Sequence, residues 1–239
     1  MANTDPASLQ DIMDAINTNV SNDSDTPTQA DDSDEWQARL NLIYMAIRIW
    51  GTTQDVLWNE LWATYTHDAV LSGVTTYTLT LTDYRFPGGF LRLTLNGATQ
   101  YVPIIKSEQA QSYTQNGHKG AYITGNPKDG YVLNLTWTPT AGDGTFGATP
   151  VFDYYKYPYK PPGTDPSNEK LEMSDPNFVI FWVSAQKALL ESQNNKYTVY
   201  DAQATESLDN MRIMNDLLPD YQNNQVENTD ALNGAILGE

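Results

Sequence analysis

The strongest helical pattern in the sequence begins near residue 34. Large apolar side chains recur there at intervals of three or four residues, at Trp36, Leu40, Ile43, Ile47 and Trp50. This spacing places them on one face of an α-helix. Ser33 is a suitable N-cap residue, and Gly51 is of the type that commonly ends a helix. The pattern therefore predicts a helix with one buried face that ends at Gly51.

A second helix is predicted directly after Gly51. Thr52 and Asp55 resemble the capping residues at the start of a helix. Large side chains continue to about Tyr65 and include Val56, Leu57, Trp58, Leu61 and Trp62. Trp58 and Trp62 would then lie one turn apart. The sequence thus predicts a helical hairpin over residues 36–73.

A shorter helical pattern lies near the beginning of the chain. Its apolar residues are Leu9, Ile12, Met13, Ile16 and Val20. Residues 20–34 are polar, acidic and almost free of large apolar groups, which is typical of a linker or an extended arm. Because no nearby segment offers the first helix a surface, residues 1–35 are predicted to form an acidic N-terminal arm. That arm is either frayed or docked onto a partner.

Alternation of apolar and polar residues replaces the helical pattern from residue 74. The segment "TTYTLTLTDY" alternates Tyr77, Leu79 and Leu81 with threonines, as in a half-buried strand. Two further alternating runs flank Asn96-Gly97, the preferred pair for a two-residue hairpin turn. Other candidate strands are 120–125, 131–139 and 150–158, and 106–113 has the composition of one helical turn. Residues 74–158 are therefore predicted to form an antiparallel β domain of five or six strands.

Helical patterns return in the last third of the chain. A Pro-rich segment at 160–176 is predicted to be an exposed loop. Helices are predicted at 177–192 and 199–217, so that residues 159–218 supply a loop and a helix pair. The predicted fold class is α+β: N- and C-terminal helix pairs form a bundle that carries the β domain as an insertion. Extended arms flank it, the C-terminal one being an acidic tail over 219–239.

The charge of the chain is concentrated in these arms. The formal net charge is −17, yet residues 1–35 carry nine acidic and no basic side chains, and residues 219–239 carry four acidic and no basic ones. Tight binding to a phosphate backbone needs Lys and Arg, so this distribution argues against it. No apolar run is long enough to cross a membrane, and no secretory signal is recognised. We expect no membrane partner.

Candidate catalytic chemistry is sparse. The chain has no cysteine, which excludes disulfides and thiolate sites. Neither His67 nor His118 has a second histidine or a carboxylate at metal-ligand spacing. No phosphate-binding loop, dinucleotide turn or nucleophile elbow is present. We therefore predict no catalytic, cofactor-binding or metal-binding residues and no enzymatic activity, although a carboxylate pair assembled by the fold remains an open alternative.

The segment "YYKYPYK" at 154–160 supports two interpretations. Four tyrosines and two lysines suit a stacking platform for sugar or nucleic acid. Strand alternation places Tyr155, Tyr157 and Tyr159 on one face, and packing of that face against the helical bundle explains it without a ligand. With Trp137, the platform interpretation corresponds to a carbohydrate-binding module.

The order of several segments resembles one protein family. They are "WNELW" (58–62), "GVTTYTLTLTDYRFPGGFLRL" (73–93), "NGATQYVPI" (96–104), "NPKDGYVLNLTWTPT" (126–140) and "FDYYKYP" (152–158), followed by a proline loop and a helix pair. Over residues 36–217 this order is similar to that of the head-to-tail adaptor proteins of tailed bacteriophages, the group that includes the tail tubular protein A of podoviruses. The acidic arm and loop 160–176 do not match that family.

The resemblance implies a structural virion protein without a cofactor. Twelve copies would form a ring beneath the portal protein and join the capsid to a tail or nozzle protein. DNA would pass through the ring without sequence-specific binding. The chain would reside in the virion neck, and in the host cytoplasm during assembly. The alternatives are another tail- or capsid-associated virion protein and the carbohydrate-binding module.

Interaction residues are predicted from the same patterns. One row of the second predicted helix can face the β domain or an adjacent subunit, and the apolar "AILG" segment in the acidic tail can dock on a neighbour. The candidate subunit or partner contacts are Trp58, Trp62, Tyr155, Tyr157, Ile236 and Leu237.

Overall fold

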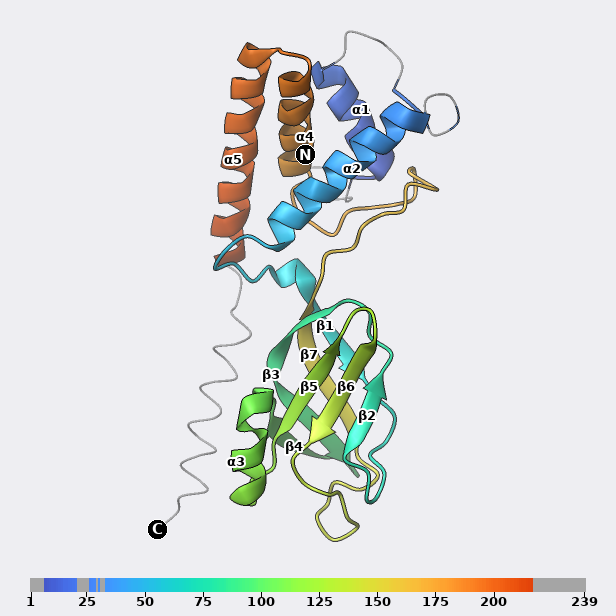
Figure 1. Cartoon of the computed structure of the whole chain (residues 1–239), viewed down its shortest axis with the longest axis vertical. Coiled ribbons are helices and arrows are strands. Elements are labelled where there is room, and N and C mark those ends of the chain that lie inside the picture. Colours follow the sequence, from blue (N-terminus) through green and yellow to red (C-terminus); the bar gives the residue numbers. More distant parts are fainter. Residues whose placement is uncertain (1–6, 21–25, 29, 31–32, 217–239) are drawn as a thin grey trace. The chain divides into compact units, whose positions relative to one another are not determined.

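The computed structural model describes residues 7–20, 26–28, 30 and 33–216. Within them the chain forms two compact units, a helical unit from the segments up to Leu61 and from Pro158 onward, and a β unit over Trp62–Tyr157. The α1–α2 and α4–α5 helices pack together, and two antiparallel sheets lie between them in the sequence (Figure 1). The predicted α+β fold is therefore confirmed.

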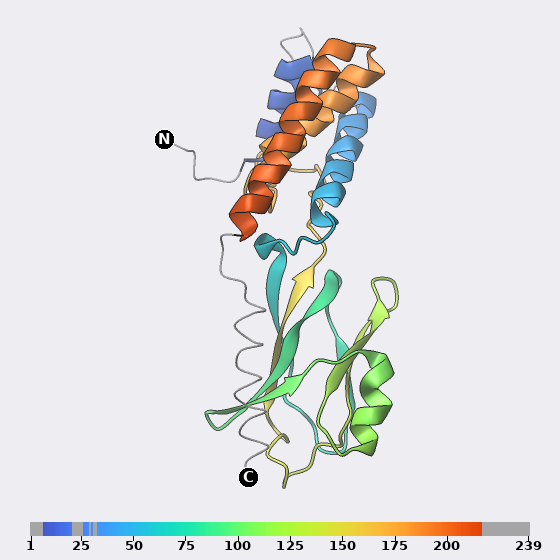
Figure 2. The ribbon, with the colours of Figure 1, turned by 90° about the vertical axis from the view of Figure 1, so that its left-hand side faces the viewer.

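Four long helices build the helical unit. They are α1 (Leu9–Val20), α2 (Ser33–Gly51), α4 (Asn177–Leu190) and α5 (Asn194–Asp216). Helix α4 packs against each of the other three (Figure 2). The apolar stripe of α2, from Trp36 to Trp50, is buried as predicted. The helix also ends at Gly51 as predicted. Glycine is required at this position because a Cβ atom there would lie 2.5 Å from the ring of Pro158.

Helix α1 corrects the prediction of an extended N-terminal arm. The side chains of Leu9, Ile12, Met13 and Ile16 are fully buried, and the helix packs on α4. Its first turn is fixed by a backbone bond from Leu9 to the carbonyl of Glu169, 2.7 Å long. The apolar face of this helix is thus buried within its own chain, so the helix is neither frayed nor docked onto a partner. Most of the predicted linker at 20–34 lies outside the described residues.

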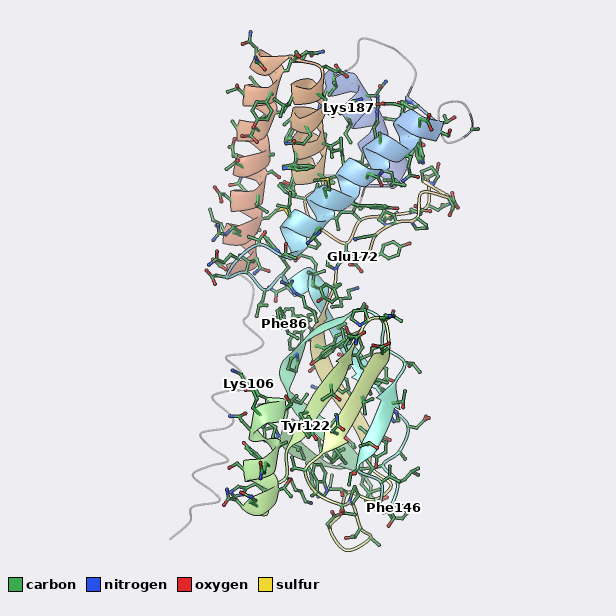
Figure 3. The ribbon with its side chains drawn as sticks, in the orientation of Figure 1. Phe86, Lys106, Tyr122, Phe146, Glu172 and Lys187 are labelled. Carbon is green, nitrogen blue, oxygen red and sulfur yellow. The ribbon has the colours of Figure 1, made fainter. Side chains whose placement is uncertain are left out.

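A partly buried charge network joins three of these helices. Glu35 accepts hydrogen bonds from Arg39 Nε at 2.8 Å and from Lys187 Nζ at 2.5 Å. Lys187 lies on α4 (Figure 3). The Arg39 guanidinium also donates to the side-chain oxygen of Asn17 in α1, at 3.1 Å. Burial raises the pKa of Glu35. The hydrogen bonds from Lys187 and Arg39 lower it by more than burial raises it, so the pKa lies below its ordinary value. These hydrogen bonds connect α2 to both α1 and α4.

The second helix predicted after Gly51 does not form. Asp55 has a φ of 59°, and the next regular structure is a short 3₁₀ turn at Asn59–Leu61, followed by strand β1 (Trp62–Thr66). The indole nitrogen of Trp58 donates to the carbonyl of Trp50 at 2.6 Å and folds this segment back on α2. Pairing with a distant strand, β7, determines the conformation from Trp62 onward. The prediction of a hairpin of two helices was wrong because local propensity yields to such tertiary contacts.

The loop at 160–176 is less exposed than predicted. Leu171 and Met173 are buried, and the Tyr44 hydroxyl donates to the carbonyl of Pro161 at 2.6 Å. Glu169 organises its middle part by accepting backbone N–H bonds from Gly163, Thr164 and Asp165, at 2.6 to 2.9 Å. The loop is therefore a packed element of the helical unit.

Acid is expected to weaken this loop. Burial raises the pKa of Glu169, but the N–H donors of Asp165, Gly163 and Thr164 outweigh burial and leave the pKa below its ordinary value of 4.5. The stabilisation is therefore complete above that ordinary value and is lost as the pH falls through the lowered pKa. We expect Glu169→Gln to reduce the free energy of unfolding at neutral pH by about 1–2 kcal/mol.

Urea titrations at neutral pH and at pH values below 4.5 check this prediction. The difference between the wild-type chain and the variant should shrink as the pH falls. Glu206→Gln, an exposed change on α5, is the matched control and should have little effect at either pH. An equal loss for Glu169→Gln at both pH values would contradict the assigned role.

Two antiparallel sheets form the β unit. Its other strands are β2 (Thr76–Leu79), β3 (Tyr84–Leu95), β4 (Ala98–Pro103), β5 (Ala121–Asn126), β6 (Gly130–Leu135) and β7 (Thr149–Lys156). One sheet has the order β1-β7-β3-β4 and the other β2-β6-β5. Both sheets contribute to one apolar core, which includes Leu91, Leu133 and Phe152. The predicted hairpin at Asn96-Gly97 is confirmed, with φ of 51° and 80° at the two turn residues.

A short helical segment connects the two sheets. The 3₁₀ turn Ser107–Gln109 and helix α3 (Ala110–Gln115) follow β4, where a helical turn was predicted. Before that turn, an isolated parallel bridge joins Ile104 to Ala121 at the start of β5. In the described part of the chain, no helix is long and apolar enough to cross a membrane.

Candidate interaction pocket

The tyrosine segment at 154–160 does not form a stacking platform, which was one of the two interpretations of its sequence. Strand β7 is a central strand, paired with both β1 and β3. Tyr154 and Tyr155 therefore point to opposite faces, and both are buried. Tyr157 and Tyr159 follow the end of the strand and remain about half exposed. Trp137 lies elsewhere, with the Lys119 amino group 5.6 Å from its ring centroid. No row of stacked tyrosines is available to a sugar.

The two tryptophans predicted as contacts have different positions. Trp58 is 1% exposed in the helical unit, and its ring centroid lies 5.6 Å from that of Trp50. It is a core residue of its own chain. Trp62 is half-buried on β1, and its ring meets Tyr155 edge to face at 4.9 Å. Ile236 and Leu237 are outside the described residues.

The Trp62 ring supports an irregular part of strand β3. The β3–β7 register shifts between Pro87 and Leu91, which marks a bulge at the segment Pro87–Gly88–Gly89. A Cβ atom at Gly88 would lie 2.6 Å from the Trp62 ring and 2.7 Å from the carbonyl oxygen of Asp153. Glycine is therefore required at 88 for this close approach, and Gly89 has a φ of 106°.

An ion pair holds the same region of the sheet in place. Arg92 donates two hydrogen bonds to the Asp153 carboxylate, at 2.6 and 2.9 Å. The Thr64 hydroxyl donates to the same carboxylate at 2.6 Å. These three residues come from β3, β7 and β1, so the buried Asp153 carboxylate links three neighbouring strands next to the bulge.

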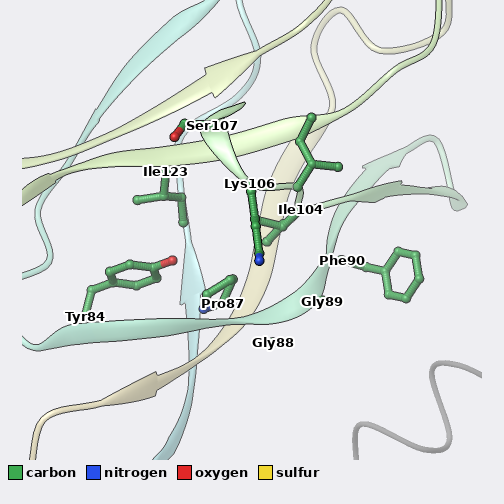
Figure 4. Close-up of a pocket in the computed structure, with 10 residues that line it drawn as sticks. Tyr84, Pro87, Gly88, Gly89, Phe90, Ile104, Lys106, Ser107 and Ile123 are labelled. Atoms are coloured by element: carbon green, nitrogen blue, oxygen red, sulfur yellow. The ribbon is translucent and has the colours of Figure 1, made fainter. Parts of the chain in front are cut away.

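A pocket opens at this bulge. Its volume is about 490 Å³, within the ordinary range for sites that take a small ligand or a few side chains. The wall is mainly apolar and comes from three segments (Figure 4): Tyr84 and 87–90 of β3, 104–107 after β4, and Ile123 of β5. Because Ile104, Ile105 and Ile123 are only partly buried, apolar surface remains for an occupant.

Two polar groups reach this pocket without a partner in the described part of the chain. The Tyr84 side chain is 9% exposed, and its hydroxyl makes no hydrogen bond there. Figure 4 shows the hydroxyl directed at the space beside Pro87, which Lys106 also enters. The Lys106 amino group forms no ion pair with the described carboxylates. Burial, with a smaller effect of Tyr131, raises the pKa of Tyr84. The hydroxyl therefore stays protonated and able to donate.

The sequence patterns did not predict this pocket, although they selected Trp62 and Tyr155, which support its wall. The signal was "RFPGGF" at 85–90, since a proline and two glycines inside a strand pattern favour a bulge or a close backbone approach. The other two wall segments have no common motif. Of the predicted contacts, the structure brings together Trp62 and Tyr155, which support the wall rather than line the pocket.

The two histidines contact backbone carbonyls or an aromatic ring. The His67 ring lies 3.1 Å from the backbone carbonyl oxygens of Asp68 and Thr78, and His118 packs edge to face on Tyr113. Among the described residues, no group of three or more potential metal ligands is found.

No family model matches the chain, and no curated protein matches it either.

Proposed function

We propose that this chain is a structural head-to-tail adaptor of a tailed bacteriophage. Twelve copies would form a ring that joins the portal protein to a tail or nozzle protein in the virion neck. One observation carries the proposal: the chain leaves a helical bundle after α2, builds a complete β unit and returns to the bundle at α4. This arrangement, with the order of segments over 36–217, resembles that of the adaptor family.

Exposed apolar side chains on the helices support a role in assembly. Met45 of α2 is 54% exposed, and Met214 of α5 is 62% exposed. Methionine is enriched at the cores of subunit interfaces and depleted on ordinary surfaces. These two side chains are therefore candidate ring contacts.

The distribution of charge supports passage of DNA without adhesion. The β unit carries six acidic and six basic side chains between residues 62 and 157. The remaining residues, 1–61 and 158–239, carry 24 acidic and seven basic side chains, so the phosphate backbone finds no strongly basic surface in the chain as a whole.

Electron microscopy of the purified chain mixed with the portal ring of the same virus tests the proposal. We expect a second ring of twelve copies stacked on the portal. The double variant Met45→Asp and Met214→Asp should stay folded by circular dichroism but join the ring at least tenfold more weakly, because two charges would enter the interface.

Asn41→Asp and Asn210→Asp, exposed changes on the same two helices, are the matched control and should assemble like the wild-type chain. A chain that never joins a portal ring would refute the adaptor proposal. A ring that tolerates both methionine substitutions would instead exclude these two side chains as contacts.

A further inference from the structure

The β-unit pocket has the properties of a peptide-binding site. It offers partly exposed isoleucines, the buried Tyr84 with a hydroxyl that has no partner in the described part of the chain, and the exposed Lys106, which pairs with no described carboxylate. An occupant that satisfies all three needs branched apolar side chains, a hydrogen-bond acceptor and a nearby carboxylate. A short acidic peptide with adjacent aliphatic residues meets these requirements.

The tail of the chain contains such a peptide. Residues 219–239 carry four acidic and no basic side chains. Ile236 and Leu237 are adjacent aliphatic residues in this tail, and Glu239 follows them at a distance of two positions. The backbone carbonyls of the same segment are acceptors for a hydroxyl donor. Residues 235–239 thus offer aliphatic side chains for the apolar wall, backbone acceptors for the Tyr84 hydroxyl and a carboxylate for Lys106.

The tail begins close to the entrance of the chain into the β unit. The side chain of Asn215, near the end of α5, accepts the backbone N–H of Asn59 at 2.9 Å and donates to the carbonyl of Leu57 at 3.1 Å. Asn59 precedes Trp62 by three residues, and the Trp62 ring touches Gly88 of the pocket wall.

The length of the tail exceeds this separation. About 20 residues join Asn215 to Ile236, and an extended chain spans ~3.3 Å per residue, or up to ~65 Å. Printed contacts and chain length bound the distance to be covered: Asn215 hydrogen-bonds to Asn59, the chain from Asn59 to Trp62 spans at most ~10 Å, and the Trp62 ring touches Gly88. The tail is therefore long enough to reach the pocket of its own chain.

We propose that the pocket is a docking site for residues 235–239 of the same chain. Ile236 and Leu237 contact Ile104, Ile105 and Ile123, the Glu239 carboxylate pairs with Lys106, and a backbone carbonyl of the segment accepts the Tyr84 hydroxyl. The docked tail covers the apolar wall and is unavailable to other subunits until it is released. This inference does not rest on the adaptor proposal, because it concerns the isolated chain.

Disulfide trapping in the full-length chain tests the proposal directly. The chain has no cysteine, so Ser107→Cys and Gly238→Cys introduce the only two thiols. Mild oxidation of dilute protein should give an intramolecular disulfide, because docking raises the effective concentration of one thiol at the other. The matched control pair is Lys128→Cys with Gly238→Cys. Position 128 lies in the exposed turn at the far end of β5.

We expect trapping to be at least tenfold faster for the 107/238 pair than for the 128/238 pair. Ile236→Ser with Leu237→Ser should reduce the rate to that of the control, and Lys106→Ala should reduce it about threefold or more. Circular dichroism verifies that each variant is folded. Equal rates for the two pairs, or a rate that is insensitive to Ile236 and Leu237, would overturn the proposal. A disulfide-linked dimer as the main product would also overturn it, since the tail would then occupy a second copy.

Discussion

Replacing Trp58 by alanine is expected to lower the free energy of unfolding of the helical unit by about 3–5 kcal/mol. The side chain is 1% exposed and packs against Trp50. Truncation leaves a large cavity and also removes the hydrogen bond from the indole to the Trp50 carbonyl. Trp58 follows α2 without belonging to a helix, and its packing restrains this segment together with the hydrogen bonds from Asn215 to Leu57 and Asn59. Urea titration followed by the helical circular dichroism signal measures the loss.

Two further variants separate packing from surface effects. Trp58→Phe keeps most of the ring and loses the hydrogen bond, and it should cost about 1 kcal/mol plus the smaller loss of packing. Leu57→Ala changes the neighbouring side chain, which is 36% exposed, and should have a small effect. A Trp58→Ala protein as stable as Leu57→Ala would show that the segment does not depend on this contact.

Replacing Asp153 by alanine is expected to destabilise the β unit by about 3 kcal/mol. The carboxylate is nearly buried and holds Arg92 and Thr64 from the two flanking strands. Its removal leaves the Arg92 guanidinium, only 29% exposed, without its partner. Native-state hydrogen exchange of the backbone amides of β3 and β7 measures the loss in this unit.

A double-mutant cycle identifies the origin of that loss. Arg92→Met added to Asp153→Ala removes the unpaired charge, so the double variant should be more stable than Asp153→Ala alone. Asp68→Asn changes an exposed carboxylate of the same unit and should be nearly neutral. If Arg92→Met and Asp153→Ala had simply additive effects, the ion pair would not be the source of the stability.

The interaction pocket could be predicted only in part. The Pro87–Gly88–Gly89 segment indicates a bulge from its composition alone. Its closeness to Lys106 and Ile123 depends on how β3, β4 and β5 meet, through the bond from Ile104 to Gly89 and the bridge from Ile104 to Ala121. Such contacts join residues with no shared local pattern. The contact between Trp62 and Gly88 could not be predicted either, because the local pattern indicates a helix at Trp62.

The sequence by itself determined the elements whose pattern is complete within one segment. The stripe from Trp36 to Trp50, the Asn96-Gly97 turn and the alternating strands of the β unit each bury a face that their own periodicity defines. The α+β class follows from the order of these elements. Tertiary structure alone decided the segments whose partners are distant in the chain. Helix α1 is buried because α4 supplies its surface, and Trp62–Thr66 is a strand because β7 offers it a ladder. A local pattern records which face is apolar, but only the folded chain supplies the surface that covers it.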